Sequence, residues 1–196
     1  MTMTSEEFSM LHTYLHKSQH YLEFGSGVST LHASCVPKIK TIDSVESSEG
    51  FADNLIKRYS AIQTALSMEK LKFKIIDIGE TGNFGFPLNE SKKNLWPNYS
   101  KSIFLDKSNH DLVLIDGRFR VACTLQCILN TPNDCTILIH DFWNRPEYHI
   151  LLKFLHPLER VDTFGVFNKK DQTLDMDEIN MLIYQYQYLP GDKVPV

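Results

Sequence analysis

Charged side chains recur in this sequence at the points where short apolar segments end. These side chains are Glu23, Glu46, Asp77, Asp116 and the pair His140-Asp141. If the apolar segments are parallel strands, their carboxyl ends meet at one edge of a sheet, where open α/β folds bind ligands. Carboxylates accept hydrogen bonds from hydroxyl groups and attract cations, and histidine exchanges a proton near neutral pH. The pattern predicts a cleft that binds a hydroxylated or cationic ligand and can move protons.

The segment 21–30 reads Tyr-Leu-Glu-Phe-Gly-Ser-Gly-Val-Ser-Thr. An apolar run that passes through two glycines one residue apart is typical of a strand, a tight turn and a helix N-terminus. The free N–H groups at such a helix start bind nucleotide-like or anionic groups. Thr30 stands where the dinucleotide-binding motif has Gly or Ala, which weakens a dehydrogenase interpretation. A β-turn that binds no ligand is the alternative.

Glu46 closes the next apolar segment, 19 residues after Gly27. This is close to the spacing at which an acidic side chain receives the two hydroxyls of a ribose. A solvated glutamate at a strand end is the alternative. The glycine turn and the acid together favour a nucleotide-type ligand.

The sequence Glu-Phe-Gly-Ser-Gly, followed by an acid at the end of the next strand, resembles the class I S-adenosylmethionine-dependent methyltransferases. The segments 112–117 and 136–141 fall where that family has its fourth and fifth strands. More narrowly, the sequence is similar to compact bacterial methyltransferases of unassigned substrate, and more distantly to sugar O-methyltransferases. The resemblance implies an α/β fold, a Rossmann-like three-layer sandwich. Its seven-stranded, mostly parallel sheet would have the order 3-2-1-4-5-7-6, with an antiparallel C-terminal strand.

The resemblance also implies the cofactor, S-adenosyl-L-methionine, and the residues that would bind it. They are Glu23, Gly25, Ser26, Gly27, Ser29, Thr30, Glu46, Ser47, Asp77, Ile78, Asp116 and Gly117. Asp77 and Ile78 would lie beside the adenine, although an exposed acid at a strand end is an equal alternative for Asp77.

Three residues are candidates for the chemistry of methyl transfer. An alcohol acceptor needs a base, and His140 suits this role because its ordinary pKa is near neutrality. Asp116 and Asp141 could instead hold a divalent metal such as Mg²⁺, which would polarise the acceptor hydroxyl. Metal-dependent sugar and catechol O-methyltransferases have an acid where this sequence has His140 and a lysine where it has Phe119. Metal use is therefore left open.

The acceptor is predicted to be a small hydroxylated molecule, with oxygen favoured as the methylated atom. Arg118 and Arg120 follow the fourth predicted strand and Arg145 follows the fifth. They indicate an anionic acceptor, such as a uronic acid or a phosphorylated sugar, with structural salt bridges as the alternative. Trp96 and Tyr99 are candidates for stacking on the acceptor. They lie in the irregular segment 79–106, which is either a lid or wall of the site or a loop folded over the core.

The remaining pattern predicts the supporting elements. Thr4 to Glu7 resembles a capping box, which would begin a helix within an N-terminal addition at 1–19. We expect further helices at 28–34, 48–66 and 146–155, strands at 71–78, 111–115 and 135–139, and a closing antiparallel pair at 160–167 and 179–189.

Length and composition limit the class of protein. The chain has 196 residues, a formal net charge of −4, a pI near 6.0 and four cysteines without a Cys-x-x-Cys pair. We expect one domain over 1–196, cytoplasmic and with reduced thiols, a possibility of homodimerisation, and no nucleic-acid or membrane partner. Two alternatives to a methyltransferase are kept: an NAD-dependent oxidoreductase, and a catalytically silent Rossmann-like binding module.

Overall fold

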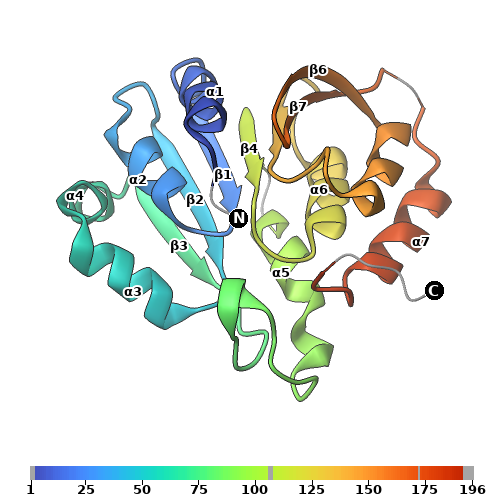
Figure 1. Ribbon diagram of the computed structural model, residues 1–196, viewed down its shortest axis with the longest axis horizontal. Helices are drawn as coiled ribbons and strands as arrows, with labels where there is room; N and C mark the ends of the chain where they lie inside the picture. The colour runs from blue at the N-terminus through green and yellow to red at the C-terminus, as the bar shows by residue number, and fades with distance from the viewer. Residues whose placement is uncertain (1–2, 106–107, 172, 192–196) are drawn as a thin grey trace.

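The computed structural model describes residues 3–105, 108–171 and 173–191. Its centre is a seven-stranded sheet of order β3-β2-β1-β4-β5-β7-β6 (Figure 1). The strands are β1 (His20–Phe24), β2 (Thr41–Glu46), β3 (Leu71–Ile75), β4 (Leu112–Ile115), β5 (Thr136–Ile139), β6 (Leu155–Val161) and β7 (Phe164–Lys169). Neighbours among β1 to β5 are parallel, and β7 runs antiparallel to both β5 and β6. The predicted fold class and strand order are confirmed.

Helices cover both faces of the sheet (Figure 1). They are α1 (Ser5–Leu15), α2 (Val28–Cys35), α3 (Glu49–Arg58), α4 (Ser60–Ser67), α5 (Pro97–Lys101), α6 (Arg120–Asn130) and α7 (Met176–Tyr186), with short 3₁₀ helices at Asn83–Gly85, Lys93–Leu95, Ser102–Phe104 and Pro146–Lys153. Alternate residues of each strand face opposite layers. Leu112 and Leu114 belong to the core on the α1–α2 side, whereas Val113 and Ile115 belong to the core on the α6–α7 side. All four are at most 1% exposed, as expected for a parallel strand covered on both faces.

The C-terminal part of the chain differs from the prediction. The antiparallel pair is formed by β6 and β7, and the expected strand at 179–189 lies mostly in α7. Asp175 caps this helix, because its Oδ1 accepts from the N–H groups of Asp177 and Glu178 at 3.1 Å. The buried residues Ile179, Leu182, Ile183 and Tyr186 have a helical spacing.

Three smaller boundaries also differ. The helix predicted at 48–66 is two helices, because the backbone of Tyr59 is extended (φ −124°, ψ 113°) and separates α3 from α4. The third strand ends at Ile75 rather than at 78, and the segment after Pro146 is a 3₁₀ helix that ends at Lys153. Among the described residues, no helix is both long enough and apolar enough to cross a membrane.

The predicted capping box of α1 is confirmed. Thr4 Oγ1 accepts from the N–H of Glu7 at 3.2 Å, and the N–H of Thr4 donates to Glu7 Oε2 at 2.9 Å. Unlike most capping acids, the Glu7 side chain is buried. It reaches the turn between β6 and β7, where Thr163 donates to Glu7 Oε1 from its N–H (3.1 Å) and its Oγ1 (2.7 Å).

The turns after β1 and β4 touch each other through their glycines. The N–H of Asp116 donates to the carbonyl of Phe24 at 2.9 Å, and Gly25 has a φ of +94°. A methyl group added at Gly25 would lie 2.8 Å from Gly117 Cα. The two turns can therefore meet only if neither carries a side chain at this point.

This contact predicts that Gly25→Ala is far more damaging than Gly27→Ala. Gly25→Ala combines a backbone clash with a left-handed φ, and we expect it to lower the free energy of unfolding by about 2–4 kcal/mol. Gly27 is extended (φ 172°) with no atom within 4 Å of an added methyl group, so its substitution should cost less than about 1 kcal/mol. Urea denaturation measures both values. Equal losses in the two variants would contradict the proposed contact.

Candidate functional site

A cavity of about 550 Å³ lies at the carboxyl ends of the central strands, where the strand order reverses between β1 and β4. This is the position at which open α/β sheets bind ligands. Its lining is Gly25, Ser26, Glu46, Ser47, Ser48, Phe51, Thr81, Gly82, Phe84, Gly85, Phe86, Tyr99, Asp116, Gly117, Arg118, Arg120, Asp141 and Arg145. The segments after four strands therefore converge on one space with the loop that follows β3.

The predicted site residues divide into those that line the cavity and those that do not. Eleven line it: Gly25, Ser26, Glu46, Ser47, Tyr99, Asp116, Gly117, Arg118, Arg120, Asp141 and Arg145. Eight lie outside the lining: Glu23, Gly27, Ser29, Thr30, Asp77, Ile78, Trp96 and His140. Eleven of the predicted residues therefore share one cavity, and several of the others are buried away from its lining.

Glu23 lies beneath the glycine turn and is fully buried. Its Oε2 accepts from Tyr21 Oη (3.0 Å) and Ser29 Oγ (2.7 Å), and its Oε1 accepts from Ser44 Oγ (2.7 Å) and from Thr30. Burial raises the pKa of Glu23, and the four hydroxyl groups offset part of that rise. Thr30 also accepts from the N–H of Gly27 at 2.9 Å. These side chains fix the turn from below, which explains the threonine in place of a small residue.

Glu46 lies in the wall of the cavity, only 7% exposed. Its Oε1 accepts from the N–H groups of Ser47 (2.7 Å) and Ser48 (2.9 Å) and from Ser47 Oγ (3.2 Å), whereas Oε2 accepts from the N–H of Ser26 (3.1 Å). Because a carboxylate oxygen has two lone pairs, Oε2 keeps capacity for a ligand hydroxyl. The carboxylate is thus held rigidly by the turns after β1 and β2.

The two residues predicted beside an adenine have other contacts. Asp77 is solvent-exposed, forms a salt bridge with Lys92 and accepts from the N–H of Gly79 at 3.0 Å. These hydrogen bonds, with that from Lys92 the strongest, lower the pKa of Asp77. Ile78 is fully buried, and its carbonyl accepts from Trp96 Nε1 at 2.8 Å. Trp96 is thereby packed into the core.

The loop after β3 contributes differently from what its aromatic residues predicted. Tyr99 is 1% exposed and packs on Phe119 (ring centroids 5.6 Å apart), so it is a core residue that also contributes to the cavity lining. Burial raises the pKa of Tyr99 well above its ordinary value. Phe84 and Phe86 are more exposed and also line the cavity. Phe51 of α3 is 44% exposed and also lines the cavity.

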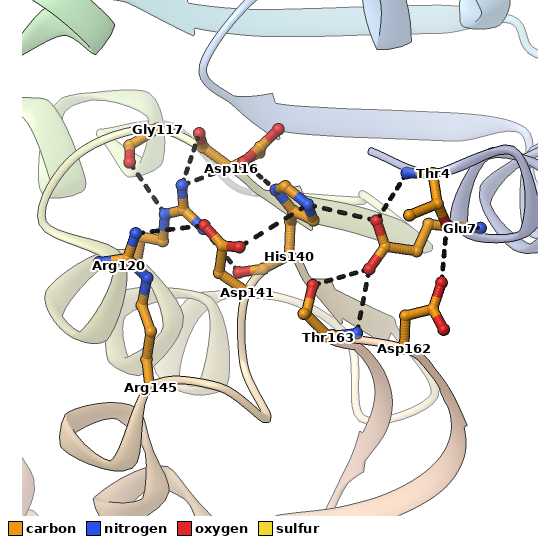
Figure 2. Close-up of polar contacts among 10 residues, drawn as sticks. All are labelled: Thr4, Glu7, Asp116, Gly117, Arg120, His140, Asp141, Arg145, Asp162 and Thr163. Carbon is orange, nitrogen blue, oxygen red and sulfur yellow. Dashed lines mark hydrogen bonds and ion pairs between the residues drawn. The ribbon is translucent and has the colours of Figure 1, made fainter. Parts of the chain in front are cut away.

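A chain of ion pairs runs from the cavity to α1 (Figure 2). Its members are, in order, Arg145, Asp141, Arg120, Asp116, His140 and Glu7. Arg120 lies at the centre, with Nη2 3.0 Å from Asp116 Oδ1 and Nη1 3.5 Å from Asp141 Oδ2. It also donates to the carbonyl groups of Gly117 (3.0 Å) and His140 (2.6 Å). Arg120 therefore joins the turns after β4 and β5.

His140 continues this chain away from the cavity. Its Nδ1 is 2.8 Å from Asp116 Oδ1, and its Nε2 is 3.4 Å from Glu7 Oε2 and 3.9 Å from Asp141 Oδ1. Burial alone would lower the pKa of His140, but the hydrogen bond to Asp116 and the charges of Asp116 and Asp141 outweigh it, so the pKa is raised. The ring is 1% exposed and both nitrogens face carboxylates. This arrangement indicates that His140 in its protonated form stabilises the neighbouring carboxylates, rather than contacting an acceptor as a general base.

The two aspartates do not form a suitable metal site. Asp116 and Asp141 each pair with the guanidinium of Arg120, which would compete with a cation placed between them. Burial would raise the pKa of Asp141, but the charges of His140, Arg120 and Arg145 outweigh it and lower the pKa. Among the described residues, no group of three or more His, Cys, Asp or Glu side chains has the geometry to hold a metal ion. The acids are matched to cations of the protein itself.

Solved structures with the same fold include several methyltransferases. A methyltransferase-like protein from Silicibacter pomeroyi is 26% identical, with a TM-score of 0.82 and 96% of each chain covered. A candidate caffeoyl-CoA O-methyltransferase from Staphylococcus aureus is 9% identical (TM-score 0.58, 87% of this chain and 86% of that chain), and an rRNA methylase from Streptococcus thermophilus is 9% identical (0.51, 86% and 98%). No family model and no curated protein sequence matches the chain.

These similarities and the sheet topology identify the fold as that of the class I S-adenosylmethionine-dependent methyltransferases. The resemblance drawn from the sequence is confirmed. The two more distant structures extend only the fold comparison, because their identity to this chain is 9%.

The raised pKa of His140 predicts how His140→Asn changes stability with pH. A raised pKa in the folded state stabilises the fold fully below the ordinary pKa of 6.5 and loses that effect as pH rises through the folded value. The lowered pKa of Asp141 acts oppositely: its contribution is present above 3.8 and is lost as pH falls through the folded value. His140→Asn should therefore lower the free energy of unfolding most between about pH 3.8 and pH 6.5, and less at alkaline pH.

Urea midpoints at about pH 5.5 and about pH 8.5 measure this difference. His156→Asn, at an exposed position of β6, is the matched control and should show no comparable change. A deficit of His140→Asn that grows with pH would contradict a raised pKa of His140 in the folded protein.

Proposed function

We propose that this chain is a methyltransferase that binds S-adenosylmethionine in the cavity and methylates a hydroxyl group of a small anionic molecule. The observation that carries the proposal is Glu46, a rigidly held carboxylate with one oxygen available, beside the side-chain-free turn at Gly25 and Gly117. A ribose diol needs a carboxylate that accepts hydrogen bonds from its hydroxyl groups. An adenosyl group in close contact with the protein backbone needs turns without side chains. A cavity of about 550 Å³ is within the usual range for a cofactor site.

The cofactor supplies an electrophilic methyl group on a sulfonium, and the chain's own residues bind and orient the reactants. The turn at Gly25 and Ser26 would contact the cofactor through the protein backbone. Glu46 would accept hydrogen bonds from the ribose hydroxyls, and Phe51 would cover the adenine ring. Asp116 lies between the half of the cavity beside Gly25 and Glu46, which would bind the cofactor, and the half lined by arginines, which would bind the acceptor. Its side chain is 29% exposed. Because the described residues contact its carboxylate through Oδ1, Oδ2 would accept a hydrogen bond from the ligand there. Alignment of the reactants can lower the barrier by about 7–11 kcal/mol without a strong base.

The acceptor half of the cavity is rich in arginine. Arg118, Arg120 and Arg145 line it together with Asp116 and Asp141, so the lining cations outnumber the anions there by one (three against two). The guanidinium of Arg118 lies 4.1 Å from the centre of the Phe86 ring. A flat guanidinium on an aromatic ring supports recognition of a carboxylate or a phosphate.

The acceptor is proposed to be a small molecule because this recognition lies inside a cavity. The net charge of −4 gives no general attraction to nucleic acid. The likeness to an rRNA methylase extends to the fold alone at 9% identity.

A binding module without turnover is the second candidate function. It is favoured by one observation: His140, the base expected from the sequence, is buried behind Asp116 and pairs with acids on both sides. Such a module would bind S-adenosylmethionine but would methylate no hydroxylated acceptor. An NAD-dependent oxidoreductase, the remaining alternative, would bind NADH instead of S-adenosylhomocysteine.

Calorimetry with S-adenosylhomocysteine and with NADH tests the cofactor. We expect the former to bind and Glu46→Gln to weaken it about 10- to 100-fold, because a hydrogen bond to a charged group contributes about 1.5–3 kcal/mol. Asp77→Asn is the matched control: this exposed acid lies outside the lining, so affinity should not change. Tight NADH binding without S-adenosylhomocysteine binding would overturn the proposal. A large loss in Asp77→Asn would restore its predicted place beside the adenine.

Arg118→Ala tests the anionic acceptor. With an acidic acceptor identified from a panel of hydroxylated acids, we expect KM to rise about tenfold or more, through loss of a charged hydrogen bond. The affinity for S-adenosylhomocysteine should stay within about twofold of the native value. An unchanged KM would remove the assignment of Arg118 to the acceptor.

A further inference from the structure

Glu7 is an acid at the start of α1 that is 1% exposed, a burial that a capping role does not require. Burying a carboxylate is costly unless its oxygens are paired. Oε1 accepts twice from Thr163, whereas Oε2 accepts from the N–H of Thr4 and faces His140 Nε2 at 3.4 Å. The structure therefore commits one oxygen to docking α1 and the other to the histidine behind the cavity (Figure 2).

The histidine transmits this constraint to Asp116. His140 Nδ1 and Arg120 Nη2 both approach the same oxygen, Asp116 Oδ1, at 2.8 and 3.0 Å. Among the described residues, the hydrogen bonds and ion pairs of this carboxylate all go to Oδ1. Because Asp116 lines the cavity, the two oxygens have different tasks: Oδ1 is bound to protein and Oδ2 is available to a ligand.

We propose that Glu7 is a positioning residue of the cavity. Acting through His140, it fixes the Asp116 carboxylate so that one oxygen stays bound to protein and the other faces the ligand. Glu7 does not contact the cavity itself. The identity of that ligand as an adenosyl compound rests on the proposed function, but the coupling of Glu7 to Asp116 does not.

The charges around His140 make the coupling specific to Glu7. The ring is faced by Asp116 after β4, Arg120 of α6, Asp141 after β5 and Glu7 of α1, and the Phe164 ring of β7 packs at 6.2 Å without charge. Asp141 is already shared with two arginines. Glu7 is therefore the carboxylate that holds the Nε2 side of the ring, while Asp116 holds the Nδ1 side. Loss of the Glu7 charge would free the ring, and with it Asp116 Oδ1, to change position.

Glu7→Gln is the informative substitution, because it removes the charge while its one amide oxygen can still accept either from the N–H of Thr4 or from Thr163. Its effect is measured as a double-mutant cycle with Asp116→Asn, using calorimetric affinity for S-adenosylmethionine. We expect Glu7→Gln to weaken binding about fivefold in the native background and to have no further effect when Asp116 is already Asn. Equal losses in both backgrounds would show a purely structural role and would overturn the proposal.

Asp162→Asn is the matched control. Asp162 is an exposed acid at the same junction, accepts from Thr4 Oγ1 at 2.9 Å and contacts neither His140 nor the cavity. Its φ of +48° is tolerated by asparagine. This variant should leave the affinity unchanged. A loss equal to that of Glu7→Gln would mean that docking of α1 alone matters.

A second measurement needs no ligand and separates failure of this proposal from failure of the proposed function. In ¹⁵N-histidine NMR spectra, His140 should lose its proton at a lower pH in Glu7→Gln and in Asp116→Asn than in the native protein. In Asp162→Asn it should lose its proton at the same pH as in the native protein. If adenosyl compounds do not bind, these titrations decide the coupling alone. An unchanged His140 titration in Glu7→Gln would overturn it. Should that variant unfold, His140→Asn, which keeps a donor toward Asp116, is compared with His140→Ala for retention of affinity.

Discussion

Desolvation of charge is the constraint on which the cavity depends. Asp141, Arg120 and His140 are all at most 4% exposed, so each must be matched by an opposite charge or by a hydrogen bond. The result is an alternating series in which the acids and cations of four elements determine one another's positions. No member can move independently, because it would leave a neighbour buried and unpaired. A cavity wall built in this way is rigid without being apolar.

The acids at the ends of β1 and β2 show how burial divides similar residues into different tasks. Glu23 accepts from four hydroxyl groups and has no surface in the cavity, whereas Glu46 accepts mainly from backbone N–H groups and stays at the wall. Glu23 holds Ser29 and Thr30 at the start of α2, and so it shapes the turn that Glu46 then binds through Ser26. One acid builds the turn and the other lines the cavity.

The sequence predicted individual strands and the glycine turn because strand ends, turns and apolar runs are local patterns, whereas the order of the sheet came from the resemblance to the class I S-adenosylmethionine-dependent methyltransferases. It failed where the decisive contact is distant in the chain. The burial of Glu7 depends on Thr163, and the burial of Trp96 depends on the carbonyl of Ile78. His140 was predicted as a base from its residue type. Its environment, with acids from α1 and from the β4 turn, is set by tertiary structure alone.

The prediction of a strand at 179–189 was wrong for a different reason. The helical spacing of its buried residues was present in the sequence, at Ile179, Leu182, Ile183 and Tyr186. Alternating tyrosines gave a competing two-residue period, and the capping residue Asp175 should have decided between them. For the site, the residue types at the strand ends indicated where the cavity lies. They could not indicate which oxygen of which acid remains available to a ligand.

The two halves of the cavity are built by different means, and this bears on how specificity could change. The half beside Gly25 and Glu46 uses backbone groups and the absence of side chains, which any sequence variant must preserve to keep the turns together. The half beside Asp116 uses side-chain charges that are supported from α1, an element before the first strand of the sheet. Substitutions in α1 can therefore alter the charged half while the glycine turns stay intact. A common fold can in this way keep one part of a cavity constant and vary the other from outside the sheet.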